Sequence, residues 1–218
     1  MLLRMLELGM RVDEIIFCDT GVEFPQMYEH IAKVESYTGR QITKLKAAND
    51  YEYMLLEKEV HRRDGTIRHG FSFPDMRIRW CTSYFKRDVI EKHLKGKNTV
   101  VSVGIAVDES GRARDNKKRY PLIEWGWTEA DALQYCYDKG FDWGGLYRIF
   151  KRVSCWCCPL KSLDELRKLR KHFPELWAKL LRWQCKTFRT FKPSWSVNDL
   201  DARFQREEEA KAAQMILF

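Results

Sequence analysis

The sequence lacks any apolar run of the roughly 20 residues that a membrane-spanning helix needs, and its first residues lack the plan of a secretory signal peptide. It also lacks internal repeats and low-complexity segments, which excludes a solenoid and a disordered tail. Acidic residues are outnumbered by basic ones, 31 to 39, so the formal net charge is +8 and favours an anionic partner. We therefore expect a cytoplasmic protein without membrane contact.

What is present indicates a globular chain. Hydrophobic residues make up 44% and charged residues 32% of the 218 residues, a composition typical of folded domains. The length is that of one domain with an appended subdomain.

The order of the expected elements predicts an α/β fold. A short apolar run over residues 14–19 closes in Asp19-Thr20-Gly21, as a buried strand feeding a tight loop would. Pro25 suits the first turn of a helix that ends near Gly39, and residues 41–45 suit a second strand. Strand, helix and strand in this order form a parallel βαβ unit with a right-handed crossover.

The rest of the chain divides near residue 150. Further predicted elements are helices over 51–58 and 82–94, an exposed loop over 62–70, and a buried strand over 99–105. From Lys161 onward, leucines recur at helical spacing, Pro174 divides two helices, and 201–213 forms a charged final helix. We expect an α/β domain over 1–150 and a cysteine cluster with a helical tail over 151–218.

Seven cysteines in a chain without a signal peptide favour metal or thiol chemistry over a disulfide framework. Cys155 and Cys158 have C-x-x-C spacing, with Cys157 between them. Thiolates select zinc, copper(I) or iron–sulfur clusters. Adjacent cysteines crowd one tetrahedral ion, whereas a cluster with separate iron corners can use them.

Cys81 is the candidate for a fourth ligand, because it lies at the start of a helix, where a thiolate is favoured electrostatically. The alternative is that these cysteines are small buried hydrophobic residues, as free cysteines often are. We expect that alternative to hold for Cys18, Cys136 and Cys185, which lie inside apolar patterns.

Five segments occur in the order found in one known family. They are 17–25 (FCDTGVEFP), 79–86 (RWCTSYFK), 104–114 (GIAVDESGRAR), 120–125 (YPLIEW) and 147–159 (YRIFKRVSCWCCP). Together they resemble the phosphoadenylyl sulfate (PAPS) reductase family, within the adenine-nucleotide α-hydrolase folds. The resemblance covers roughly residues 1–160 and implies a Rossmann-like parallel sheet with a C-terminal helical subdomain that carries cysteines.

The resemblance also implies ligands and partners. It implies an adenine nucleotide or adenylyl sulfate-type substrate, with a [4Fe–4S] cluster as cofactor and zinc as the alternative. The cluster would be held by Cys81, Cys155, Cys157 and Cys158. The substrate-binding residues implied are Asp19, Thr20, Gly21, Lys86, Glu109, Ser110, Arg112 and Arg114.

Simpler roles exist for some of these residues. Asp19 could cap the following helix, and the basic residues over 112–119 could form a solvated loop.

Two family elements are missing. The chain has no S-G-G-x-D-S phosphate loop, so we expect it to be N-terminally incomplete, and no E-C-G-x-H element near residue 218. The predicted function is a PAPS reductase-like enzyme of sulfur metabolism. One alternative is a sulfurtransferase that adenylates DNA or tRNA and meets it through the basic helices after Lys161. The other is a non-catalytic, metal-stabilised module that binds nucleotides or nucleic acid.

Overall fold

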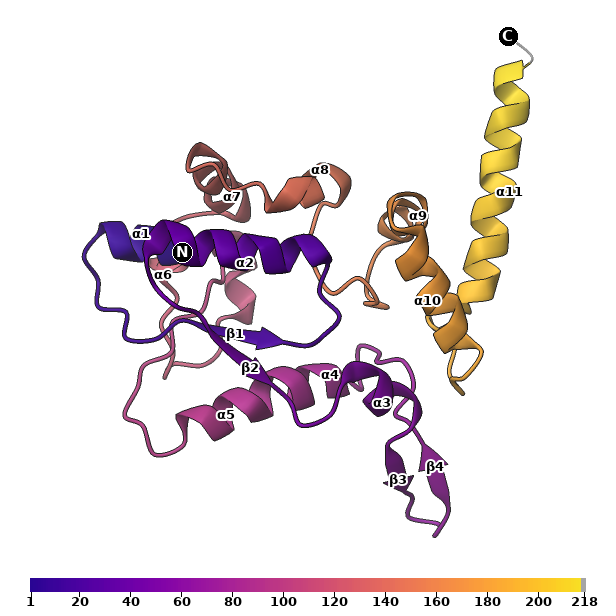
Figure 1. Ribbon diagram of the computed structural model, residues 1–218, viewed down its shortest axis with the longest axis horizontal. Helices are drawn as coiled ribbons and strands as arrows, with labels where there is room; N and C mark the ends of the chain where they lie inside the picture. Colours follow the sequence, from indigo (N-terminus) through magenta and orange to yellow (C-terminus); the bar gives the residue numbers. More distant parts are fainter. Residues whose placement is uncertain (217–218) are drawn as a thin grey trace. The chain divides into compact units, whose positions relative to one another are not determined.

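The computed structural model describes residues 1–216 (Figure 1). The α-helices are α1 (Leu2–Glu7), α2 (Pro25–Thr38), α3 (Tyr51–Leu56), α4 (Trp80–Thr82), α5 (Asp88–Leu94), α6 (Pro121–Glu124), α7 (Glu129–Asp138), α8 (Leu146–Ile149), α9 (Leu163–His172), α10 (Pro174–Gln184) and α11 (Val197–Ile216). The strands are β1 (Ile16–Asp19), β2 (Thr43–Lys46), β3 (Glu59–His61) and β4 (Ile67–His69). A short π-helix, η1 (Ser83–Arg87), joins α4 to α5. The segments η2 (Val107–Arg112) and η3 (Trp143–Gly145) are short 3₁₀ helices.

The chain forms two compact units that are interleaved in sequence. The first contains residues 1–18, 25–45 and 90–147, and the second contains residues 19–24, 46–89 and 148–218. The predicted boundary near residue 150 stays a prediction.

The first unit contains most of the predicted βαβ segment. β1 and β2 pair as a two-stranded parallel sheet, with α2 as the connection, so these three predicted elements are confirmed (Figure 1). The predicted third strand over 99–105 is wrong, because only Ser102 makes a bridge, to Arg119. The described residues are thus a mixed α/β fold without a clear Rossmann-like sheet. The 99–105 run is apolar enough for a strand but has no neighbouring strand to extend the pairing.

The second unit is built around aromatic side chains. Tyr51 lies 5.1 Å from Trp80 and 5.7 Å from Trp183, measured between ring centroids. Trp156 stacks on Trp183, with 5.0 Å between the ring centroids. Offset aromatic contacts of this kind add to the free energy gained from burial alone. The cysteine segment is therefore anchored to the core through Trp156.

The predicted loop over 62–70 is partly wrong, because β3 and β4 pair there as an antiparallel hairpin. Glu59 pairs with His69, Val60 with Arg68, and His61 with Ile67. The hairpin turns at Asp64 and Gly65, where Gly65 has a φ of +81°, a conformation that glycine adopts without strain.

The predicted helical tail is confirmed. α9 begins with a capping box in which Ser162 and Glu165 bond each other's backbone amides, and α10 begins at Pro174. The leucine stripe is buried, with Leu166, Leu169 and Leu180 inaccessible to solvent. This apolar face explains why the helices pack rather than remain separate.

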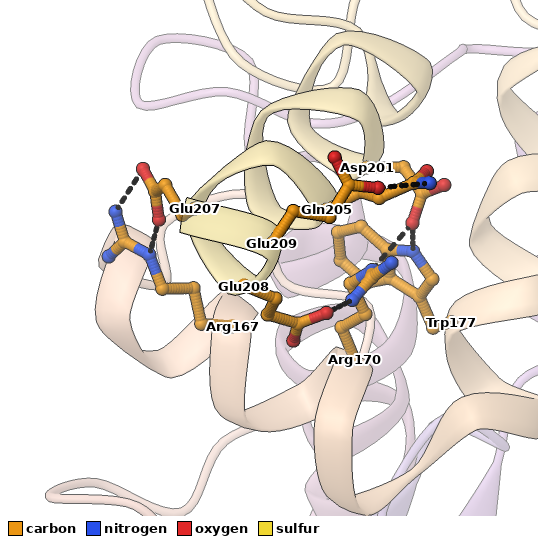
Figure 2. Close-up of polar contacts among 8 residues, drawn as sticks. All are labelled: Arg167, Arg170, Trp177, Asp201, Gln205, Glu207, Glu208 and Glu209. Atoms are coloured by element: carbon orange, nitrogen blue, oxygen red, sulfur yellow. Dashed lines mark hydrogen bonds and ion pairs between the residues drawn. The ribbon is translucent and has the colours of Figure 1, made fainter. Parts of the chain in front are cut away.

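Ion pairs connect α11 to the two preceding helices (Figure 2). Asp201 accepts hydrogen bonds from Arg170 Nε and from Trp177 Nε1, both at 2.7 Å. Glu207 receives a two-bond contact from Arg167, at 2.5 and 3.0 Å. Arginines of the tail are thus engaged by acidic residues of the same unit.

Among residues 1–216, no helix combines the length and apolar character needed to cross a membrane.

We predict that Asp201→Ala lowers the free energy of unfolding by about 1–3 kcal/mol, because it leaves the buried Trp177 indole and the Arg170 guanidinium without their shared acceptor. Urea denaturation of the full chain measures this change. The control is Asp164→Ala, which removes an exposed ion pair with Lys168 and costs less than about 1 kcal/mol. Equal losses in the two variants would contradict the bridging role of Asp201.

Candidate thiol and anion site

A short loop after β1 carries three of the predicted binding residues into the second unit. Asp19 accepts a hydrogen bond from the Gly21 amide at 3.0 Å and forms an ion pair with Lys46 at 3.2 Å. Gly21 has a φ of +73°, which favours glycine at this turn. Thr20 is buried, and its hydroxyl donates to Glu23 at 3.0 Å. The loop is thus held by its own polar side chains.

The same loop contacts the cysteine segment. The Trp156 amide donates to the Val22 carbonyl at 3.1 Å. The Cys155 thiol donates to Glu23 Oε1 at 3.5 Å and lies 4.0 Å from the Thr20 hydroxyl. Residues 19–24 and 155–156, far apart in the sequence, therefore meet at one place.

The four predicted ligand cysteines lie in the second unit and influence one another electrostatically. Cys155 to Cys158 form a turn closed by a 3.2 Å hydrogen bond between the Cys158 amide and the Cys155 carbonyl. Cys157 is 1% exposed, and its sulfur interacts with those of Cys155, Cys158 and Cys81. Cys81, in α4, also interacts with Cys158. The four side chains thus belong to the same unit, and Cys157 is close enough to the other three for their charges to interact.

Burial raises the pKa of three of these thiols, those of Cys81, Cys155 and Cys157, and so keeps them protonated. It raises the pKa of Cys155 to about 12, with the Glu23 carboxylate adding to the effect and Lys86 opposing it. Burial likewise raises the pKa of Cys81, and that of Cys157 well above its usual range. Such thiols are poor nucleophiles but become thiolates when a metal replaces their protons.

Tyr51 is a site residue that the sequence did not single out. It begins α3, which is capped by the Asp50 side chain, and its ring is packed among the core aromatics. Its hydroxyl hydrogen-bonds to Cys157, and burial raises the pKa of Tyr51 well above its usual range. Tyr51 is therefore a neutral hydrogen-bond donor to a sulfur.

Two lysines, also missed from the sequence, lie beside the thiols. Lys161 is 2% exposed, and its ammonium lies 4.8 Å from the Phe150 ring centroid and 5.5 Å from that of Phe24. It has no hydrogen-bond partner among the described residues. Burial lowers the pKa of Lys161, while the nearby Glu165 and the thiol groups of the cysteine segment raise it.

Lys192 is the second of these lysines. Its ammonium donates to the carbonyl oxygens of Pro159 and Lys161, each at 2.7 Å. Burial lowers the pKa of Lys192, and Cys158 counteracts this. Two lysines thus flank the turn that carries the cysteines. Lys161 is close to Cys158 in the sequence, whereas Lys192 reaches the turn only through the fold.

The other predicted anion-binding residues are divided between the units. Lys86 lies in the short π-helix η1 of the second unit. Glu109, Ser110, Arg112 and Arg114 belong to the first unit. There, Arg112 is paired with Glu109, and Arg114 Nε donates to the Gly111 carbonyl at 3.1 Å. The structure thus places the loop of Asp19, Thr20 and Gly21 beside Cys155, through Thr20, and it pairs Arg112 with Glu109.

The cysteines expected to be buried outside the cluster differ among themselves. Cys18 and Cys136 are partly buried, whereas Cys185 is exposed, so the expectation is wrong for Cys185.

Among residues 1–216, no three Cys, His, Asp or Glu side chains form a group that could hold a metal ion.

The comparisons with known proteins give distant relatives. No family model and no solved structure matches the chain. It is 28% identical to the uncharacterized protein MJ0066 of Methanocaldococcus jannaschii, a match covering 82% of this chain and 37% of the relative. For MJ0973 of the same organism, the values are 26%, 76% and 40%.

A third relative has an assigned activity. The chain is 27% identical to adenosine 5'-phosphosulfate reductase 2 of Bacillus subtilis, over 69% of this chain and 63% of that enzyme. The chain therefore has a distant similarity to a reductase of adenylyl sulfate, and it spans well under half the length of the two archaeal relatives.

We predict that Cys185 is the first of the seven cysteines to be alkylated by iodoacetamide at neutral pH, because it is exposed while Cys155 and Cys157 are buried with raised pKa values. Mass spectrometry of the folded chain, sampled over time, measures this order. Alkylation of Cys155 or Cys157 as fast as Cys185 would contradict the described burial.

Proposed function

We propose that the chain is a PAPS reductase-like enzyme of sulfur metabolism that acts on an adenylated sulfur substrate with the help of a [4Fe–4S] cluster. The observation that carries the proposal is the gathering of Cys81, Cys155, Cys157 and Cys158 in one unit beside the Asp19-Thr20-Gly21 loop. The distant similarity to an adenylyl sulfate reductase supports the same chemistry.

The residues present fit an anionic cluster. A fully buried ammonium without a hydrogen-bond partner is costly unless a negative charge lies near it, and Lys161 is in this situation beside three thiols. Glu165 stabilises part of this charge, and a bound cluster with four thiolates, which has a net negative charge, would stabilise it further.

Each group then has a role. Cys81, Cys155, Cys157 and Cys158 would hold the cluster, which supplies an electron-transfer and electrostatic centre when bound. Tyr51 donates a hydrogen bond to Cys157 and thereby orients it. Before a cluster binds, the hydrogen bond from the Cys155 thiol to Glu23 and the contact with Thr20 fix the position of Cys155. Lys86 would bind sulfate or phosphate oxygens of the substrate, with Asp19 and Gly21 lining the nucleotide site.

In this proposal, the two predicted reaction types share one site. As an oxidoreductase, the chain would bind adenylyl sulfate and present its sulfur to the reductant. As a sulfurtransferase, it would bind an adenylated acceptor in the same place. The residues of the second unit would serve substrate binding in either case.

The test is iron and acid-labile sulfide analysis after anaerobic purification of the wild type, Cys81→Ala and Cys155→Ala. We expect the wild type to contain both elements and each variant to lose most of them, because each removes a ligand. The matched control is Cys185→Ala, which removes an exposed cysteine and retains the wild-type content. Full iron and sulfide in Cys81→Ala and Cys155→Ala, or stoichiometric zinc in the wild type, would contradict the proposal.

A further inference from the structure

The β3–β4 hairpin and the turn after α10 each bring one arginine to the same phenyl ring. The ζ-carbon of Arg68 lies 4.2 Å from the ring centroid of Phe188, and that of Arg189 lies 5.5 Å from it. Arg62 belongs to the same face of the hairpin as Val60, and Val60 is the cross-strand partner of Arg68. We call Arg62, Arg68 and Arg189 with Phe188 the arginine cluster.

The arginine cluster has more positive charge than its neighbours neutralise. Arg189 pairs with Asp75 at 3.4 Å, and Arg62 has a long contact of 3.9 Å with Asp64. Arg68 Nε is buried and has no hydrogen-bond partner among the described residues. Burial lowers the pKa of Arg68, and repulsion from Arg189 and Arg62 lowers it further. Asp75 and Asp64 thus neutralise the three guanidinium groups only in part, and the remaining positive charge favours a bound anion.

The cluster is also held in position. The Arg189 amide donates to the Ser72 hydroxyl at 3.1 Å, and its carbonyl accepts from Gln184 at 3.0 Å. Phe188 is half exposed. A guanidinium fixed against a ring loses less conformational entropy when it binds a ligand.

The basic residues of the helical tail differ in this respect. Arg167 and Arg170 are bonded to Glu207, Asp201 and Glu208 of α11, and Lys168 to Asp164. Arg167, Lys168 and Arg170 are therefore neutralised within the unit, whereas the hairpin carries the exposed residues Arg62 and Arg63 at its turn.

We propose that the arginine cluster binds the phosphate backbone of a nucleic-acid strand. Guanidinium groups bind phosphate oxygens with two parallel hydrogen bonds, and a strand offers phosphates at regular intervals to several arginines at once. Arginine planes stacked beside an exposed ring also provide a surface on which an unpaired base can stack. This surface is distinct from the thiols and goes beyond the proposed enzymatic function.

The test is fluorescence anisotropy of the full chain with labelled oligonucleotides of mixed sequence, as RNA, single-stranded DNA and duplex DNA, over a series of salt concentrations. We expect binding that weakens with salt. Arg62→Gln weakens it about tenfold at roughly 0.1 M salt and reduces the slope against salt by about one, as the loss of one phosphate contact does. Phe188→Leu, which keeps an apolar side chain but removes the ring, also weakens binding.

The matched control is Lys168→Gln, which removes one positive charge that is already paired with Asp164 and leaves binding unchanged within about twofold. Equal weakening by Lys168→Gln and Arg62→Gln would overturn the proposal, and so would salt-independent binding or no binding to any oligonucleotide. Displacement by polyglutamate, or equally strong binding to anionic lipid vesicles, would overturn it in favour of an acidic protein or a membrane surface.

Discussion

The burial of an ammonium group beside three thiols is the constraint on which the second unit depends. Lys161 lies between the rings of Phe24 and Phe150 with no hydrogen-bond partner among the described residues. Interactions with aromatic faces offset only part of the cost of removing its charge from water. The Glu165 carboxylate supplies part of the remainder. In the proposed function, the thiolates of a bound cluster would supply the rest.

The surrounding aromatic core serves this arrangement. Trp156, inside the cysteine segment, stacks on Trp183 of α10, and Tyr51 of α3 lies against Trp183 from another direction. The aromatic packing therefore fixes the backbone of the cysteine turn and the hydroxyl that bonds to Cys157. A rigid, water-poor setting of this kind strengthens electrostatic interactions between the lysine and the sulfurs.

Local patterns predicted the helices well, whereas the predicted ligand role of the cysteines stays a prediction. The leucine spacing after Lys161, the prolines at 25 and 174, and the C-x-x-C pair are signals within a few residues, and the structure contains α2, α9 and α10 where they indicate helices. Interactions between distant residues were not predictable. Arg167 and Glu207 are 40 positions apart, so their pairing could not be read from the sequence, and the basic helices looked more highly charged than they are.

The errors have related physical causes. The 99–105 run has the composition of a strand, but a strand needs a partner, and the chain supplies only one bridge there. The hairpin was expected to be a loop because its residues are polar, although Asp64-Gly65 is a turn signal between two short strands. Glu23, Tyr51 and Lys161 were missed because a single carboxylate, tyrosine or lysine acquires a role only through the tertiary contacts that surround it.

The central proposal is that Cys81, Cys155, Cys157 and Cys158 form one ligand set for an iron–sulfur cluster. Iron X-ray absorption spectroscopy of the anaerobically purified wild-type chain tests it most directly, because it reports the atoms around each metal. The account predicts iron surrounded by sulfur with further iron atoms nearby. Iron with only oxygen or nitrogen neighbours, or a chain that contains zinc and no iron, would contradict it.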